Sequence, residues 1–93
     1  MSRNIQSVTI TGGANHANVS RLTGWSIRES AGTPAAAAVN LRKAAVGGQI
    51  VATIELAANG STTQIVNDGW ISCEGGCYVE VVSGTVEGVL YYR

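Results

Sequence analysis

The chain has 93 residues, of which only 13% are charged, and its six acidic and six basic side chains cancel. A chain of this length forms one domain, expected here over residues 1–93, and an ordinary soluble domain has about 25% charged residues. Arg42-Lys43 is the only adjacent basic pair, and no segment approaches the roughly 20 apolar residues of a membrane span, so neither nucleic acid nor a membrane is expected as a partner.

Turn signals divide the chain at short intervals. Glycine supplies positive φ at little cost, and Asn-Gly and Asp-Gly pairs mark hairpins. The runs between these signals are rich in Val, Ile, Thr, Trp and Tyr, which is typical of strands in a β-sandwich. The signals are Gly12-Gly13, Gly32, Gly47-Gly48, Asn59-Gly60, Asp68-Gly69, Gly75-Gly76 and Ser83-Gly84.

The predicted fold class is therefore all-β, an antiparallel β-sandwich. Eight short strands are expected, which is the number in a jelly roll. In chain order they are Ile5–Ile10, Val19–Glu29, Ala36–Arg42, Gln49–Ala57, Ser61–Val66, Gly69–Cys73, Cys77–Val82 and Thr85–Tyr92. Residues 1–4 are expected to form a flexible arm.

Two of these strands alternate clearly, which predicts their faces. In the second, Leu22, Gly24 and Ser26 are expected on one face and Arg21, Thr23, Trp25 and Ile27 on the other. In the fourth, Ile50, Ala52, Ile54 and Leu56 are expected to point one way and Val51, Thr53 and Glu55 the other.

The segment from Thr33 to Lys43 fits two structures. Thr33 as N-cap, Pro34 at the first helical position and the alanines that follow are helix signals. The alternation of Val39, Leu41 and Lys43 with smaller or polar neighbours favours a strand, and a helix there would have only a weak apolar stripe. A strand over Ala36–Arg42 is predicted.

The last two predicted strands are apolar on both faces. Such a pattern predicts either packing against another subunit on one face or a central strand covered by a loop. The residues concerned are Val79, Val81, Val86, Val89 and Leu90. Together with the sparse charge and the thin core of a small chain, this favours a homo-oligomer over a monomer solvated by its Ser, Thr, Asn and Gly residues.

The sequence holds no catalytic or metal-binding motif. His16 has no nearby carboxylate and is expected to be a surface loop residue, and a carboxylate-based enzyme would need two acids facing each other. Glu55, Glu80 and Glu87 alternate with apolar residues and are expected on solvated faces, whereas Asp68 and Glu74 are explained as turn residues. We therefore expect no enzyme, no cofactor and no metal.

Cys73 and Cys77 flank the Glu74-Gly75-Gly76 turn, and the strands on either side are expected to pair. The two cysteines would then face each other, so a disulfide is geometrically possible. The N-terminal residues lead into alternating residues and not into an apolar signal core, so no signal peptide is expected. This expectation favours reduced thiols and synthesis in a cytoplasm. The spacing fits neither a zinc site nor a redox Cys-x-x-Cys motif.

The aromatic residues are the predicted interface anchors, because aromatic side chains dominate interface hot spots. A sugar-stacking platform is the alternative, and it requires at least two of them coplanar and exposed in a cleft. The candidates are Trp25, Trp70, Tyr78, Tyr91 and Tyr92.

Four stretches resemble small virion proteins of tailed bacteriophages: Arg21–Ser26, Val39–Arg42, Ile50–Ala57 and Gly75–Gly88. The resemblance implies a jelly-roll or sandwich subunit, often a homotrimer, that decorates or cements a capsid or sits in fibres. It carries no catalytic residues, and Cys77 stands where it leads us to expect an ordinary apolar residue.

The expected function is thus a capsid decoration (cement) protein that is made in the host cytoplasm and lies on the virion surface. Its expected partners are further copies of itself, three being the favoured number, and the major capsid protein. A carbohydrate-binding module for host attachment is the alternative.

Overall fold

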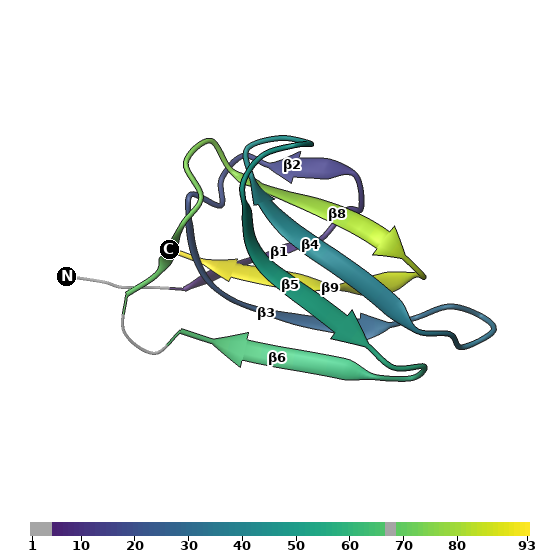
Figure 1. Cartoon of the computed structure of the whole chain (residues 1–93). Coiled ribbons are helices and arrows are strands. Elements are labelled where there is room, and N and C mark those ends of the chain that lie inside the picture. Colours follow the sequence, from purple (N-terminus) through teal and green to yellow (C-terminus); the bar gives the residue numbers. More distant parts are fainter. Residues whose placement is uncertain (1–4, 67–68) are drawn as a thin grey trace.

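The computed structural model describes residues 5–66 and 69–93, and within them the chain forms nine strands and no helix (Figure 1). The strands are β1 (Gln6–Thr9), β2 (Ala14–His16), β3 (Arg21–Glu29), β4 (Ala37–Lys43), β5 (Ile50–Leu56), β6 (Ser61–Ile65), β7 (Ile71–Ser72), β8 (Cys77–Ser83) and β9 (Val86–Tyr92). The all-β prediction is confirmed. The expected arm over residues 1–4 lies outside the described residues.

The described strands form two antiparallel sheets. Sheet A has the order β1-β9-β3-β6, with β7 also pairing with β3, and sheet B has the order β2-β8-β4-β5. The first half of the chain pairs with the second half in nested order: β1 with β9, β2 with β8, β3 with β6 and β7, and β4 with β5. Successive pairs alternate between sheet A and sheet B. The chain therefore resembles one long hairpin, with the first half against the second, that is wrapped into a jelly roll.

The predicted strands are confirmed with two differences. The ambiguous segment is among those confirmed: it is strand β4 and pairs on both sides, with β5 and with β8. The segment predicted as a loop around His16 contains β2, a short strand that pairs with β8. The strand predicted over Gly69–Cys73 shrinks to Ile71–Ser72, which continues along β3 beyond the end of β6.

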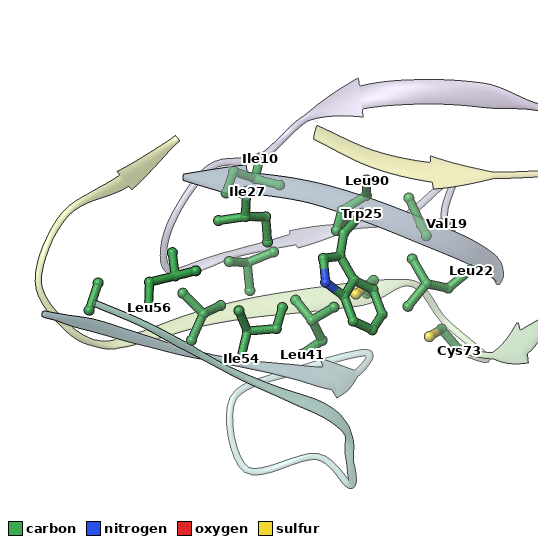
Figure 2. Close-up of a cluster of buried hydrophobic side chains, with 14 residues drawn as sticks. Ile10, Val19, Leu22, Trp25, Ile27, Leu41, Ile54, Leu56, Cys73 and Leu90 are labelled. Atoms are coloured by element: carbon green, nitrogen blue, oxygen red, sulfur yellow. The ribbon is translucent and has the colours of Figure 1, made fainter. Parts of the chain in front are cut away.

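The hydrophobic core lies between the inner faces of the two sheets (Figure 2). Trp25 of β3 points from sheet A toward sheet B, and Leu41 of β4 comes from the opposite side. The core consists of Ile10, Val19, Leu22, Trp25, Ile27, Ala37, Val39, Leu41, Ile54, Leu56, Cys73, Cys77, Val79 and Leu90. Full burial of a large aliphatic side chain contributes about 1.5–3 kcal/mol, so these residues stabilise the sandwich.

A β-bulge changes the faces predicted for β3. The pairing with β9 shifts between Leu22 and Gly24, which leaves Thr23 as an extra residue. One extra residue reverses the alternation. Leu22 therefore lies in the core together with Trp25 and Ile27, and the prediction that placed Leu22 on the opposite face is wrong.

A second β-bulge changes the faces predicted for β5. Arg42 pairs with Ile50 and Leu41 with Ala52, so Val51 is the extra residue. As a result Val51 packs against the core, whereas Ile50 is 41% exposed. The predicted faces hold for Ile54 and Leu56, which are buried, and are reversed for Ile50 and Val51.

The two C-terminal strands, β8 and β9, belong to different sheets. Val79 and Val81 of β8 and Val86 and Leu90 of β9 therefore approach one core from opposite sides. This arrangement explains their apolar pattern without a covering loop or a second subunit. Val89 is the exception, because its neighbours Gly88 and Leu90 lie in the inner row and it points outward.

The predicted pairing across the Cys73–Cys77 turn is also wrong. The chain leaves sheet A after β7 and enters sheet B at Cys77. Cys73 therefore follows a strand of sheet A, and Cys77 begins a strand of sheet B. Gly75 and Gly76 both have positive φ, 86° and 116°, and the Gly76 N–H donates to the carbonyl of Cys73 at 2.8 Å. The tight turn predicted from these glycines exists, but it connects sheet A to sheet B and not two paired strands of one sheet.

Candidate functional site

The most distinctive surface of the molecule is the face of sheet A that points away from the core. Trp25, Ile27 and Leu90 point inward, so the residues that alternate with them point outward. The pairing of four strands aligns these outward residues in two rows. We call them the central outer face: Ser7, Tyr91, Gly24 and Ile65 in one row, and Thr9, Val89, Ser26 and Thr63 in the next.

None of the eight residues of the central outer face is charged. Ser7, Thr9, Thr63 and Ile65 are exposed, and most of the others are half-buried by their neighbours within the sheet. Ile65 itself is 41% exposed. The face therefore presents hydroxyl and apolar groups to its surroundings.

Gly24 adds no side chain to the central outer face, and the neighbouring strand packs closely against it. A Cβ atom on Gly24 would lie 2.2 Å from the carbonyl oxygen of Gln64 and 3.1 Å from Cδ1 of Ile65. The strands β3 and β6 thus approach where a side chain is missing, and the Ile65 side chain folds over the glycine. Only glycine fits this position without moving the backbone of β6.

A shallow hollow of about 200 Å³ adjoins the second row. On one side the hydroxyls of Ser26 and Thr63 are hydrogen-bonded at 3.2 Å, and on the other the Nε of Arg28 donates to Glu87 at 2.6 Å. Arg28 and Glu87 are mostly exposed, so this ion pair is screened by water and contributes little to stability. Polar and apolar groups line the hollow in nearly equal measure, from Ser26, Ile27, Arg28, Ser61, Thr63, Glu87 and Gly88.

A stacked pair lies at the opposite end of sheet A. The guanidinium carbon of Arg21 lies 4.8 Å from the centre of the Trp70 ring, which is a cation–π arrangement. Trp70 is 48% exposed. Trp and Arg are the residue types most enriched in interface hot spots, so this pair extends the outer face with a suitable anchor.

The outer face of sheet B has a different character, because a charged network crosses it. The carboxylate of Glu80 accepts hydrogen bonds from the Nδ2 of Asn40 at 2.9 Å and the Nε of Arg42 at 3.0 Å. These two donors hold the pKa of Glu80 below its ordinary value. Arg42 also donates to the carbonyl of Gly48, so its charge is fixed in place.

The five aromatic residues predicted as anchors do not form one cluster. Trp25 lies in the core and Tyr92 packs against it, so Trp25 offers no surface for binding. Tyr91 belongs to the outer face of sheet A and Tyr78 to the outer face of sheet B, where it pairs with Asn15 and Arg42. Trp70 is the exposed one, and no aromatic side chain is among the residues that line the hollow.

His16 is not the surface loop residue that was predicted. It ends β2 and is half-buried, and both ring nitrogens are hydrogen-bonded. Its Nε2 accepts from the N–H of Thr11 at 3.0 Å, so Nδ1 carries the proton and donates to the carbonyl of Cys77 at 3.1 Å. The imidazole joins the β1–β2 connection to β8, which is a structural role.

Glu29 is the carboxylate that sequence reasoning missed. It is 6% exposed and accepts hydrogen bonds from the N–H groups of Asn59 at 2.8 Å and Ala31 at 2.6 Å. These bonds to the charged form lower the pKa of Glu29. No sequence signal near Glu29 indicates this contact, which joins it to the Asn59-Gly60 turn, where Asn59 has positive φ, 62°.

The other described acidic residues and the cysteines lie apart from the central outer face and from the hollow or at the hollow's rim. Glu55 is exposed on β5, and Asp68 lies outside the described residues. Among the residues that are described, no group of three or more His, Cys, Asp or Glu side chains is placed to hold a metal ion. Cys73 and Cys77 are free and buried, and the hydrogen bond between the thiols together with burial raises the pKa of Cys77.

Comparison with known proteins found no matching family model, no matching curated protein and no matching solved structure. The described part of the chain contains no helix that is long and apolar enough to cross a membrane. The surfaces described above are therefore the basis for any statement about function.

Proposed function

We propose that this chain is a non-enzymatic structural subunit that associates with copies of itself and with a virion shell, as a capsid decoration (cement) protein does. The observation that carries the proposal is the central outer face of sheet A. It extends over four strands without a charged side chain, in a chain whose net charge is zero.

The composition of this face supports burial by another protein. The cores of protein–protein interfaces are depleted of charged residues and enriched in aromatic residues and Arg. The outer face lacks charge, has Tyr91 within it and has the Arg21–Trp70 stack at its end, which are three of these features. The network of Glu80, Asn40 and Arg42 makes the opposite sheet the solvated side of the subunit.

The virion part of the proposal rests on the resemblance of four stretches of the sequence to small phage virion proteins. A rigid jelly roll is suited to bridging neighbouring capsid subunits, because it adds buried surface without changing shape. Apolar burial would contribute on the order of 25 cal/mol per Å² before the costs of association. The major capsid protein is the proposed partner, and a trimer, the number that the resemblance favours, stays a prediction.

Light scattering on the purified chain tests self-association, with Thr9→Lys and Thr53→Lys as a matched pair. Both threonines are exposed on edge strands, Thr9 on the central outer face and Thr53 on the outer face of sheet B. We expect an oligomer for the unaltered chain at micromolar concentration. Thr9→Lys and Thr53→Lys should both keep that mass, above the 9.6 kDa of one chain, because Thr9 is expected to face the shell and Thr53 the solvent.

Co-sedimentation with shells assembled from the major capsid protein of its virus tests the second part. We expect the unaltered chain and Thr53→Lys to sediment with the shells and Thr9→Lys to stay in the supernatant. A monomeric chain that ignores the shells and binds sugars on a glycan array would overturn the proposal in favour of the carbohydrate-binding alternative.

A further inference from the structure

Strand β6 is an edge of sheet A (Figure 1). The backbone groups of three of its five residues have no strand to pair with among the described residues. The N–H of Glu29 donates to the carbonyl of Gly60, and the N–H of Val66 donates to the carbonyl of Thr23. In an antiparallel pair the direction of these groups alternates along the strand. Thr62 and Gln64 therefore point their N–H and C=O groups toward β3, and Ser61, Thr63 and Ile65 point theirs outward.

The edge of β6 lacks the features that normally prevent strand pairing. Edge strands are usually protected by charged residues, proline, bulges or short length. The sequence of β6, Ser-Thr-Thr-Gln-Ile, has no charge and no proline, and its pairing with β3 runs from Gly24 to Arg28 without a shift.

The three other sheet edges are better protected or shorter. At one end of sheet B, β5 has a bulge and Glu55, and at the other end β2 has only three residues. At the far end of sheet A, β1 has four residues, one fewer than β6. The regularly paired part of β5, Ala52–Leu56, equals β6 in length but contains Glu55, so β6 offers the longest uncharged regular edge of the described fold.

We propose that β6 pairs antiparallel with β6 of a second copy of this chain, about a two-fold axis at Thr63. This joins the two A sheets into one continuous sheet. The inference rests on the proposed self-association and specifies its contact. It predicts a dimer, whereas the resemblance favours a trimer.

The register follows from the three outward positions. Centred on Thr63, the pairing places Thr63 opposite the partner subunit's Thr63 and Ser61 opposite the partner subunit's Ile65. All three outward positions of each copy then exchange hydrogen bonds. A shift by two residues in either direction would leave one of these positions unpaired within the strand.

The side chains are compatible with a symmetric contact. In a two-fold interface each residue at the axis meets its own copy, so a charged residue there would face a like charge. Thr63 is neutral and β-branched, which suits a cross-strand pair. The nearest charged pair, Arg28 and Glu87, is internally neutralised.

A charge exchange at Thr63 tests both the contact and its register, with sedimentation velocity as the measurement and the full chain as the sample. Thr63→Lys alone and Thr63→Glu alone place like charges opposite each other, so each is expected to be a monomer. An equimolar mixture of the two is expected to form a dimer. Thr63→Val, which keeps the backbone N–H and the β-branched shape, is expected to remain dimeric.

The outcomes separate this inference from the proposed function. If the unaltered chain is an oligomer but the two single variants keep its mass, or if its mass is that of a trimer, β6 pairing is wrong while self-association stands. If the unaltered chain is a monomer, both are wrong. Circular dichroism verifies folding. If a Thr63 variant does not fold, Ser61→Lys combined with Ile65→Glu in one chain replaces it, and this double variant must dimerise because the two changes face each other.

Discussion

The carboxylate of Glu29 accepts a hydrogen bond from the N–H of Asn59 at 2.8 Å, across a sequence separation of 30 residues. Glu29 ends β3 in sheet A, and Asn59 lies in the turn that leads from β5 of sheet B to β6 of sheet A. The bond therefore fixes the point where the chain crosses between the sheets next to the edge strand β6. A second bond, to the N–H of Ala31, fixes the start of the β3–β4 connection.

Glu29→Gln should destabilise the fold. The neutral amide accepts weaker hydrogen bonds than the carboxylate, and its NH₂ group would face backbone donors. We expect the midpoint of thermal unfolding to fall by several degrees. Glu55→Gln, a change on an exposed side chain of β5, is the control and should leave the midpoint nearly unchanged. Equal midpoints for the two variants would contradict the role given to Glu29.

Acid should weaken the fold through the same carboxylate and through Glu80, because both have a lowered pKa. A lowered folded-state pKa means that the charged form is favoured by folding. The contribution is therefore complete above the ordinary value of 4.5 and is lost as the pH falls through the lowered pKa. Urea unfolding measured between pH 7 and pH 3 should show the decline, and the curve of Glu29→Gln should be flatter.

Gly24→Ala should separate β6 from β3. The new Cβ would lie 2.2 Å from the carbonyl oxygen of Gln64, which cannot move without displacing the strand. We expect a loss of roughly 1–3 kcal/mol in the free energy of unfolding, the usual cost of overpacking. Gly32→Ala is the matched control, since nothing lies within 4 Å of its Cβ position. Urea unfolding of both variants measures the difference.

The bulge in β5 predicts an unusual order of two neighbouring substitutions. Val51→Ala removes methyl groups that pack against the core, and Ile50→Ala removes a larger side chain that is 41% exposed. We expect Val51→Ala to cost about 1–2 kcal/mol and Ile50→Ala less than about 0.5 kcal/mol. The reverse order would mean that β5 alternates without a bulge.

Local sequence patterns predicted the β-class, the number of strands to within one, and the positions of most turns. These features depend on local chemistry: Asn59-Gly60 and Gly75-Gly76 favour turns wherever the strands lead, and alternation such as Ile54-Glu55-Leu56 indicates a half-buried strand. The sequence also indicated a sparsely charged surface. That observation became specific only when the sheet aligned residues from four strands on one face.

Strand pairing in three dimensions sets the faces of β3 and β5, the partition of β8 and β9 between the sheets, and the open edge of β6. A bulge is a mismatch between two paired strands, so the sequence around Leu22 or Val51 does not indicate it. Likewise Glu29 shows no sign of Asn59, and His16 none of Cys77, because their contacts join residues that are distant in sequence. Alternation and turn propensity are local, whereas pairing register and burial depend on which strands the nested jelly-roll order brings together.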